Sequence, residues 1–378
     1  MTFSWAFLSG IEANDTGTGR FMQHLQSAIL RRGKFDGTIF YAPAAKGGLQ
    51  SDLIAALLEI PHLVIFHPQM LGAEPTLRLM RQRGETGRRT HLYMLDNFFF
   101  CIRSYNHIDA ETGPCFRCVG SGESQNATRM GCRPWPASDA ASEQFVSGLA
   151  TLVQQGTVQL FAQNPGQVEI ARRHFGVNAQ ISYVGLWCAD WTGYVDAFAA
   201  SGRAEGDMTT ERPEYDIVYH GSRDLAKGIG WTLALAEQTP ELRYLVPIDR
   251  GQVNVKAPAN VTVASMRWEG GLHDAVRSAR LVLSPSLWSS PCEGALIKNI
   301  VVAKAAGVVD IPSAFSAEVP ASVVTRFPQD LRAAGPAVRD ALALNWRPDP
   351  AAREAWVAKF RAFNEGVAER LLPSSGQG

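Results

Sequence analysis

The stretch that decides the fold is residues 284–307, which read SPSLWSSPCEGALIKNIVVAKAAG. The run RLVL at residues 280–283 precedes it and predicts a strand that ends at Ser284, and a helical pattern begins at Glu293. A carboxylate at a strand-to-helix junction stands where open α/β sheets bind ligands, and it can accept hydrogen bonds from ligand hydroxyls. The alternative is that Glu293 only stabilises the dipole of its own helix.

The composition indicates a globular protein with two domains. The 378 residues exceed what one core usually serves, and 46% of them are hydrophobic. The formal net charge is zero without a long run of like charges, which argues against nucleic acid as a partner. No apolar run reaches the roughly 18 residues of a membrane span. Since the N-terminus MTFSWAFLSGIEAND lacks a basic region and a cleavage site, we expect a cytoplasmic protein with reduced cysteines.

Short apolar strands alternate with helical patterns in both halves of the chain, which indicates parallel sheets built from right-handed crossovers. The predicted strands are residues 3–8, 38–41, 63–66, 91–95, 157–161 and 180–184 in the first half, then 215–220, 243–246, 261–263, 280–283 and 308–310 in the second. A Cys-containing insertion at residues 97–136 interrupts the alternation.

The same pattern divides the chain into parts. We expect a first domain over residues 1–190, a second over 210–345, and a linker within 185–213, where Gly, Asp, Thr and Glu show no clear period. Residues 350–372 predict one amphipathic helix within a tail from 346 to 378.

Two strand-to-helix loops are candidates for contact with an anion. The first, DTGTGR at residues 15–20, places Gly17 and Gly19 before a helix N-terminus, where free N–H groups favour phosphate. A tight turn alone would also explain its glycines. The second, GSRDLAKG at residues 221–228, adds an arginine and a lysine to such a turn and suits a diphosphate. The alternative for the second loop is a solvated turn.

The second half resembles the nucleotide-binding domain of a family 4 glycosyltransferase of the GT-B fold. That family usually shows a Gly-Arg…Lys-Gly turn after the first strand of the domain and a Pro-Ser…Glu…Glu-Ala motif ahead of its final strands. The matching residues here are Gly221, Arg223, Lys227, Gly228, Pro285, Ser286 and Glu293. The resemblance extends to the early glycine loop, to Asp96 at a strand end and to the C-terminal helix, so it spans most of the chain in short motifs.

Two departures from the family pattern affect the expected site. Ser222 stands between Gly221 and Arg223, so the arginine is displaced by one position. The two glutamates of the family stand eight positions apart, but Val301 lies eight beyond Glu293. We therefore match Glu293 to the second glutamate, which in the family holds the ribose, and Ser289 or Ser290 lies where the first is expected. Trp288 either stacks on the base or packs beneath the site.

The resemblance implies two Rossmann-like domains facing each other across a cleft, with the C-terminal helix returning to the first domain. It also implies roles for single residues. Arg223 and Lys227 would neutralise the donor diphosphate as the glycosidic bond breaks, without a catalytic metal. Asp96 and His67 follow strands of the first domain and could orient or deprotonate the acceptor hydroxyl, with His107 as a further option. For His67 the alternative is a partly buried histidine that caps its strand.

Four cysteines of the insertion form a possible structural zinc site. Cys101, Cys115, Cys118 and Cys132 are separated by thirteen, two and thirteen residues, and one CxxC pair with two flanking cysteines can supply four thiolates. A forty-residue insertion without an evident core would be stabilised by such a site. Disulfides, unligated thiols and an iron–sulfur cluster are the alternatives.

The resemblance thus implies a glycosyltransferase that moves a sugar, with retention of the anomeric configuration, from a UDP- or GDP-sugar to the hydroxyl of a saccharide, lipid-linked or other acceptor. The setting that the family implies is polysaccharide or glycoconjugate assembly, where peripheral membrane contact is compatible with the sequence. One alternative is another nucleotide-sugar reaction on the same scaffold, phosphorylase-like or epimerase-like. A second alternative is a binding or assembly protein that has lost turnover, because the first motif glutamate is missing.

Overall fold

The computed structural model describes residues 3–14, 16–31, 36–108, 113–120, 127, 129–209, 213–249, 251 and 257–371. The chain forms two compact units. Unit 1 consists of Met1–Asn106, Cys115–Ala189 and Phe363–Gly378, and unit 2 of His107–Pro114 and Asp190–Ala362.

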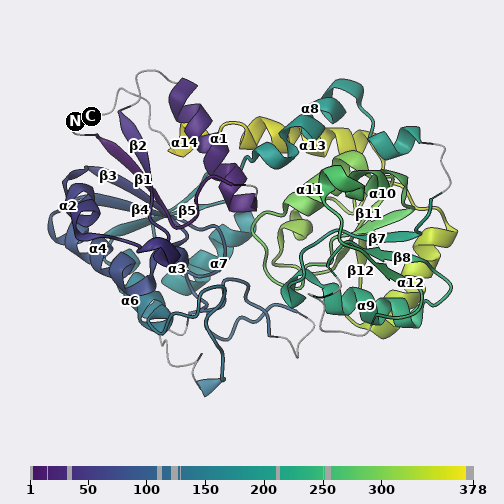
Figure 1. Ribbon diagram of the computed structural model, residues 1–378, viewed down its shortest axis with the longest axis horizontal. Coiled ribbons are helices and arrows are strands. Elements are labelled where there is room, and N and C mark those ends of the chain that lie inside the picture. The colour runs from purple at the N-terminus through teal and green to yellow at the C-terminus, as the bar shows by residue number, and fades with distance from the viewer. Residues whose placement is uncertain are drawn as a thin grey trace. The chain divides into compact units, whose positions relative to one another are not determined.

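Unit 1 is built on a six-stranded parallel sheet of order β2-β1-β3-β4-β5-β6 (Figure 1). Its strands are β1 (Trp5–Ser9), β2 (Gly37–Tyr41), β3 (His62–Phe66), β4 (Arg89–Tyr93), β5 (Val158–Ala162) and β6 (Ile181–Tyr183). Its helices are α1 (Gly17–Arg31), α2 (Ser51–Glu59), α3 (Pro68–Leu71), α4 (Ala73–Glu85), α6 (Ser142–Gln154), α7 (Pro165–Phe175) and α14 (Val367–Leu371), with the short η1 (Ala44–Lys46). Helices α2, α4 and α6 pack together on one face, and α1 packs with α14 on the other.

Unit 2 repeats this architecture with a six-stranded parallel sheet of order β12-β11-β10-β7-β8-β9. Its strands are β7 (Ile217–Tyr219), β8 (Tyr244–Val246), β9 (Val261–Val263), β10 (Leu281–Leu283), β11 (Ala306–Val309) and β12 (Thr325–Phe327). Its helices are α8 (Ala189–Ser201), α9 (Ile229–Gln238), α10 (Leu272–Ser278), α11 (Gly294–Val302), α12 (Leu331–Ala343) and α13 (Pro350–Asn364), with the short η2 (Glu205–Met208), η3 (Leu225–Lys227), η5 (Trp268–Gly270) and η6 (Phe315–Glu318).

The core of each unit lies on both faces of its sheet. Residues Ile217, Val218 and Tyr219 of β7 are fully buried, as are most residues of β3 and β10. Strands that are buried on both faces have continuous apolar sequences, which is why these strands could be predicted from the sequence. The prediction of two Rossmann-like α/β domains is confirmed.

Three details of the predicted elements are wrong. Much of the predicted linker is the helix α8, because Trp191, Val195 and Phe198 recur at helical spacing and are buried. The strand predicted at residues 308–310 is not the last, since β12 pairs with β11 beyond it. The predicted helix of residues 350–372 is divided, because α13 ends at Asn364 before Gly366 and α14 begins at Val367.

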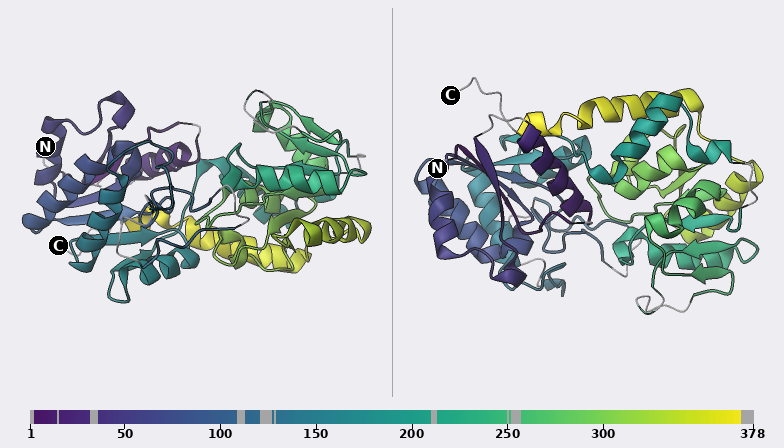
Figure 2. Two further views of the ribbon diagram at one scale, coloured as in Figure 1. Left: turned by 90° about the horizontal axis from the view of Figure 1, so that it is seen from below. Right: turned by 45° about the horizontal axis from the view of Figure 1, so that its top comes forward.

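The end of the chain joins elements that lie far apart in the sequence. In unit 2, α13 runs beside α8 (Figure 2), where Arg361 Nη2 lies 3.0 Å from Asp196 Oδ1. In unit 1, Asn364 Oδ1 accepts from the backbone N–H of Leu186 at 2.8 Å, and α14 packs on α1. Within the described part of the chain, no helix has the length and apolar character that crossing a membrane requires.

Candidate functional site

Two polar clusters lie at the carboxyl ends of parallel strands, one in each unit. In unit 2 the cluster joins Lys227, which follows β7, to Glu293, which follows β10. Lys227 Nζ lies 2.8 Å from Glu293 Oε1, and the Ser286 hydroxyl donates to the same oxygen. The side chains of Lys227 and Glu293 are 16% and 6% exposed, so this pair is largely shielded from water. The structure therefore brings together three residues that the sequence proposed from two separate motifs.

Two glycines allow the turn after β7 to lie close to residues 284–286. Gly228 has a φ of 82°, in the left-handed region, and a Cβ atom there would lie 2.0 Å from the Pro285 carbonyl oxygen. A side chain at this position would separate the β7 turn from residues 284–286. At Gly221, a Cβ atom would lie 2.5 Å from the Tyr219 hydroxyl, which itself donates to the Ser222 carbonyl at 2.6 Å. The two glycines of the motif thus let the turn fold tightly against the neighbouring loop.

The other residues proposed for this site take different positions. Trp288 is buried, and the Lys227 ammonium lies 5.0 Å from the centre of its ring, so the ring packs beneath the lysine. Ser222 and Arg223 are exposed in the same turn, where an arginine can approach an arriving anion. Ser289 and Ser290 are both buried, and the Ser289 hydroxyl lies 2.8 Å from that of Ser313.

A buried polar network beside this cluster was missed by the sequence analysis. His220 Nδ1 lies 2.6 Å from Asn299 Oδ1, and Asn299 Nδ2 donates to Ser284 Oγ at 2.8 Å. The imidazole also stacks on Trp268, with ring centres 5.1 Å apart. Burial lowers the pKa of His220 to about 4, so the ring is neutral at pH 7. The available signal was a histidine immediately after an apolar strand, directly before the glycine turn.

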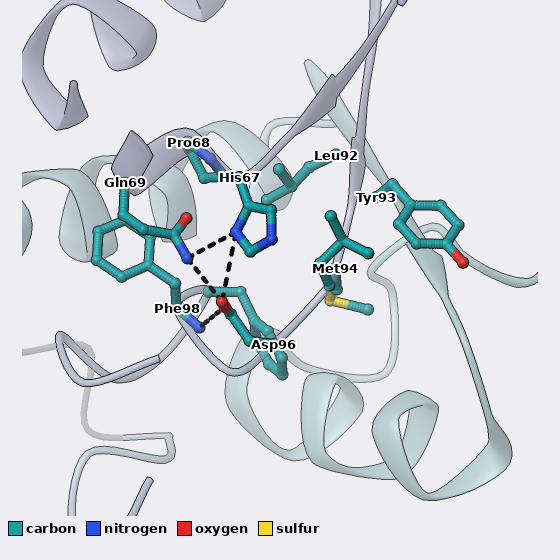
Figure 3. Close-up of a pocket in the computed structure, with 10 residues that line it drawn as sticks. His67, Pro68, Gln69, Leu92, Tyr93, Met94, Asp96 and Phe98 are labelled. Carbon is teal, nitrogen blue, oxygen red and sulfur yellow. Dashed lines mark hydrogen bonds and ion pairs between the residues drawn. The ribbon is translucent and has the colours of Figure 1, made fainter. Parts of the chain in front are cut away.

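In unit 1 the cluster centres on Asp96, which follows β4, and His67, which follows β3 (Figure 3). Gln69 connects them: its Nε2 donates to Asp96 Oδ2 at 2.6 Å and lies 3.1 Å from His67 Nδ1. The Phe98 backbone N–H donates to Asp96 Oδ1 at 2.9 Å. These residues line a cavity of about 10 Å³, which has room for about one water molecule.

Burial shifts the pKa values of Asp96 and His67 in opposite directions, because it favours the neutral form of each group. It raises the pKa of Asp96 to about 6, although hydrogen bonds from Phe98, Ser104 and Gln69 favour the carboxylate. It lowers the pKa of His67 to about 4, so the imidazole is neutral at pH 7. A carboxylate with a pKa near 6 is ionised at neutral pH yet readily accepts a proton, which is what a general base requires.

The orientation of His67 is fixed from both sides of its ring. Gln69 Nε2 lies 3.1 Å from Nδ1 on one side of the ring, and Thr18 Oγ1 lies 2.8 Å from Nε2 on the other. The backbone of His67 has a φ of 52°, a left-handed conformation that costs energy for a residue with a side chain. No sequence signal distinguishes Gln69, Ser104 and Thr18, since polar residues after a strand are common and only tertiary contact selects them. His107 is buried in unit 2 and pairs with Pro114 in an isolated bridge.

The glycine loop of unit 1 is shaped by a tight turn. A Cβ atom at Gly19 would lie 2.1 Å from Asn14 Oδ1, whereas one at Gly17 would meet nothing within 4 Å. Asn14 Oδ1 accepts a hydrogen bond from the Thr16 backbone N–H at 2.9 Å. Thr16 Oγ1 accepts one from the Gly19 backbone N–H at 3.1 Å. The turn explains Gly19, and Gly17 leaves the N-terminus of α1 open to a ligand. Asp15 lies outside the described residues.

No disulfide joins Cys101, Cys115, Cys118 and Cys132, all of which the structure describes. Burial raises the pKa of Cys118 to about 11, and Cys115 and Cys132 lie near enough to raise it further. Burial also raises the pKa of Cys101, and the other three thiols of the insertion add to this shift. In the described ranges, no group of three or more His, Cys, Asp or Glu side chains has a metal-holding arrangement. Structural zinc therefore stays a prediction.

Metal analysis of the purified protein tests that prediction. With four thiolates on zinc we expect about one zinc per chain, and Cys115→Ser with Cys118→Ser should remove both the metal and several degrees of melting temperature. The double substitution Cys188→Ser with Cys292→Ser, which leaves the insertion intact, should keep the metal. A metal-free preparation with full stability would show that the insertion folds without zinc.

Comparisons with known proteins match the chain through its structure. No protein-family model matches it, and no curated protein matches it in sequence. HepE from Anabaena in complex with UDP superposes with a TM-score of 0.58 at 11% identity, covering 98% of this chain and 99% of that one. Sucrose-phosphate synthase from Thermosynechococcus elongatus gives 0.55 at 13% identity over 97% of both chains. A UDP-forming trehalose-phosphate synthase from Burkholderia xenovorans gives 0.53 at 11% identity over 98% of both chains.

At these identities the likeness is one of fold, and it covers nearly the whole chain. The chain has the GT-B fold, as the resemblance of its motifs implied. The trehalose-phosphate synthase is UDP-forming by name, and the HepE structure holds UDP.

Proposed function

We propose that the chain is a glycosyltransferase that moves a sugar from a nucleotide-sugar donor to an acceptor hydroxyl. The observation that carries the proposal is the cluster of Lys227, Glu293 and Ser286 at the carboxyl ends of β7 and β10. Open α/β sheets bind their ligands at this edge, and the cluster offers a cation for a diphosphate and a carboxylate for ribose hydroxyls.

The donor side of the reaction belongs to unit 2. As the bond between the anomeric carbon and the diphosphate oxygen breaks, its electron pair stays on the diphosphate. The Lys227 ammonium stabilises that developing charge, and Arg223, exposed in the same turn, adds a second cation. Glu293 accepts hydrogen bonds from the ribose. UDP-sugars are the first donors to test because HepE structures hold UDP and UDP-glucose, and GDP-sugars are the next.

The acceptor side belongs to unit 1. Asp96 takes the proton of the acceptor hydroxyl as its oxygen bonds to the anomeric carbon, and His67 with Gln69 holds the carboxylate in place. The products are a glycoside, a nucleoside diphosphate and a proton. We assign retention of the anomeric configuration and a saccharide or lipid-linked acceptor, as in polysaccharide or glycoconjugate assembly, on the resemblance of the motifs.

The ribose assignment predicts selectivity against deoxynucleotides. Glu293→Gln should weaken nucleotide binding about tenfold, because a neutral amide replaces a charged acceptor of hydroxyl hydrogen bonds. The unaltered protein should also bind the ribonucleotide more tightly than its 2′-deoxy form. Calorimetric titration of both nucleotides into both proteins measures this. Equal affinities of the unaltered protein for the two nucleotides would refute the role of Glu293.

A second candidate function is a GT-B protein that binds nucleotide-sugars without turning them over. It is favoured by residues 285–292, which read PSLWSSPC and hold no carboxylate, although the family pattern has its first glutamate ahead of the one matched by Glu293. Slow hydrolysis of a nucleotide-sugar without acceptor separates the candidates. An enzyme should hydrolyse the donor that it binds, and a binding protein should leave it intact.

A further inference from the structure

A second charged pocket lies in unit 2, away from the Lys227 cluster. Its volume is about 640 Å³, which is in the range of sites for small molecules. Its charged lining residues are Arg203, Asp207, Lys304, Arg347 and Arg353, and we call it the Arg353 pocket. Nothing in the proposed transfer reaction uses it.

The topology places the Arg353 pocket at the opposite edge of the sheet. Lys304 precedes β11, so it lies at the amino ends of the parallel strands, whereas Lys227 and Glu293 follow the carboxyl ends of β7 and β10. Gly206 of η2 packs against this edge, since a Cβ atom there would lie 2.6 Å from the Lys304 backbone nitrogen. The two sites are therefore separated by the length of the strands.

Cations outnumber carboxylates among the described residues that line the pocket. Arg203, Lys304, Arg347 and Arg353 are cations, and one carboxylate, Asp207, lies 2.9 Å from Arg353 Nη1. The Arg353 side chain is 5% exposed, and its Nη2 donates to the Lys304 carbonyl at 3.2 Å. Burial lowers the pKa of both Arg353 and Arg347. Asp207 opposes this shift at both residues, and Arg347 adds a smaller lowering of the pKa of Arg353. Gathered cations repel one another, and a bound anion would relieve that repulsion.

Two of the carboxylates near the pocket are engaged with other groups. Asp349 Oδ1 accepts from the Ala352 backbone N–H at 2.7 Å and so caps the start of α13. Glu205 lies 3.1 Å from the His273 ring.

We propose that the Arg353 pocket binds a small phosphoanion, such as a pyrophosphate or a phosphate monoester. Arginine forks match phosphate oxygens two at a time, which fixes the orientation of the bound group as well as its charge. A phosphoanion of two or three negative charges also balances the excess of the lining. This inference stands apart from the proposed transfer reaction, because it rests on other residues at another edge of the sheet.

Titration of inorganic pyrophosphate, followed by equilibrium dialysis at low ionic strength, tests the proposal. The background protein is Lys227→Met with Glu293→Gln, which removes pyrophosphate binding at the other cluster. We expect one pyrophosphate per chain, and Arg203→Glu with Arg347→Glu should weaken binding at least about tenfold. Both arginines are exposed, so the fold should survive, as circular dichroism and the melting temperature will show. The matched control is Arg89→Glu with Arg332→Glu, two exposed arginines elsewhere that change the net charge equally.

A second arm distinguishes a soluble ligand from a lipid headgroup. Flotation with vesicles of phosphatidylcholine, alone or with an anionic phospholipid, reports whether the pocket takes a membrane phosphate. Binding to anionic vesicles that the Arg203 and Arg347 substitutions abolish would identify the headgroup as the source. Pyrophosphate binding without flotation would identify a soluble ligand. No pyrophosphate binding, or binding that the two pocket substitutions leave unchanged, would overturn the proposal.

Discussion

Replacement of Lys227 by methionine should lower sugar transfer by about 10²–10³-fold, the typical cost of losing one preorganised group that stabilises transition-state charge. The ammonium is held by Glu293 at 2.8 Å and rests over the Trp288 ring, so it is fixed before the donor arrives. Because the charge of the diphosphate grows only as the bond breaks, the loss should appear in kcat more than in KM. Steady-state kinetics with the donor that the protein binds measures both constants.

A matched design separates this loss from unfolding. Lys227→Met alone leaves the buried Glu293 carboxylate without its cation, which should lower the melting temperature. The double substitution Lys227→Met with Glu293→Gln removes both charges and should recover stability but not activity. Lys359→Met, an exposed lysine of α13, is the control and should change neither. Full activity of Lys227→Met would show that the diphosphate is neutralised elsewhere.

Replacement of Asp96 by asparagine should lower transfer by about 10²–10⁴-fold, the usual contribution of a general base. Burial raises the pKa of Asp96 to about 6. In the unaltered protein, kcat/KM should therefore fall as the pH drops through about 6, because protonation removes the base. The residual activity of Asp96→Asn should lack this acidic limb. An unchanged pH profile in Asp96→Asn would assign the limb to another group.

The stability of Asp96→Asn provides the control. The ordinary pKa of the carboxyl is 3.8, so between about pH 4 and 6 the folded state binds more protons than the unfolded state. The Asp96 contribution to stability is thus present at low pH and is lost as the pH rises through about 6. At about pH 8 the substitution removes a buried carboxylate, and we expect the melting temperature to be maintained or raised. His67 acts in the opposite direction, since its pKa falls to about 4.

The fold was predictable where burial produces continuous apolar runs. Residues 217–219 and 281–283 read IVY and LVL, and both lie fully within the sheet of unit 2. Helix α12 was missed because Gly335 and Pro336 interrupt its pattern. Strand β12 was missed because Arg326 occupies the middle of three residues, where its guanidinium donates to the Ser316 carbonyl at 2.9 Å.

The site was predictable only as separate motifs. Glycine turns and a carboxylate after a strand indicated Lys227 and Glu293, but they stand 66 residues apart, and only the parallel pairing of β7 with β10 brings them together. The link between Asp96 and His67 depends on Gln69, whose buried amide no spacing rule selects. Short-range signals therefore found the reactive groups, and tertiary contacts supplied the residues that orient them.

The most direct test of the central claim is a thermal-shift titration with UDP, GDP, ADP, CMP and their sugar conjugates. A ligand at about 100 times its Kd stabilises the native state by about 2.7 kcal/mol, which raises the melting temperature by several degrees. We predict that one nucleotide and its sugar conjugate raise the melting temperature of the unaltered protein but not that of Lys227→Met with Glu293→Gln. No shift with any nucleotide, or an equal shift in both proteins, would contradict a nucleotide-sugar site at Lys227 and Glu293.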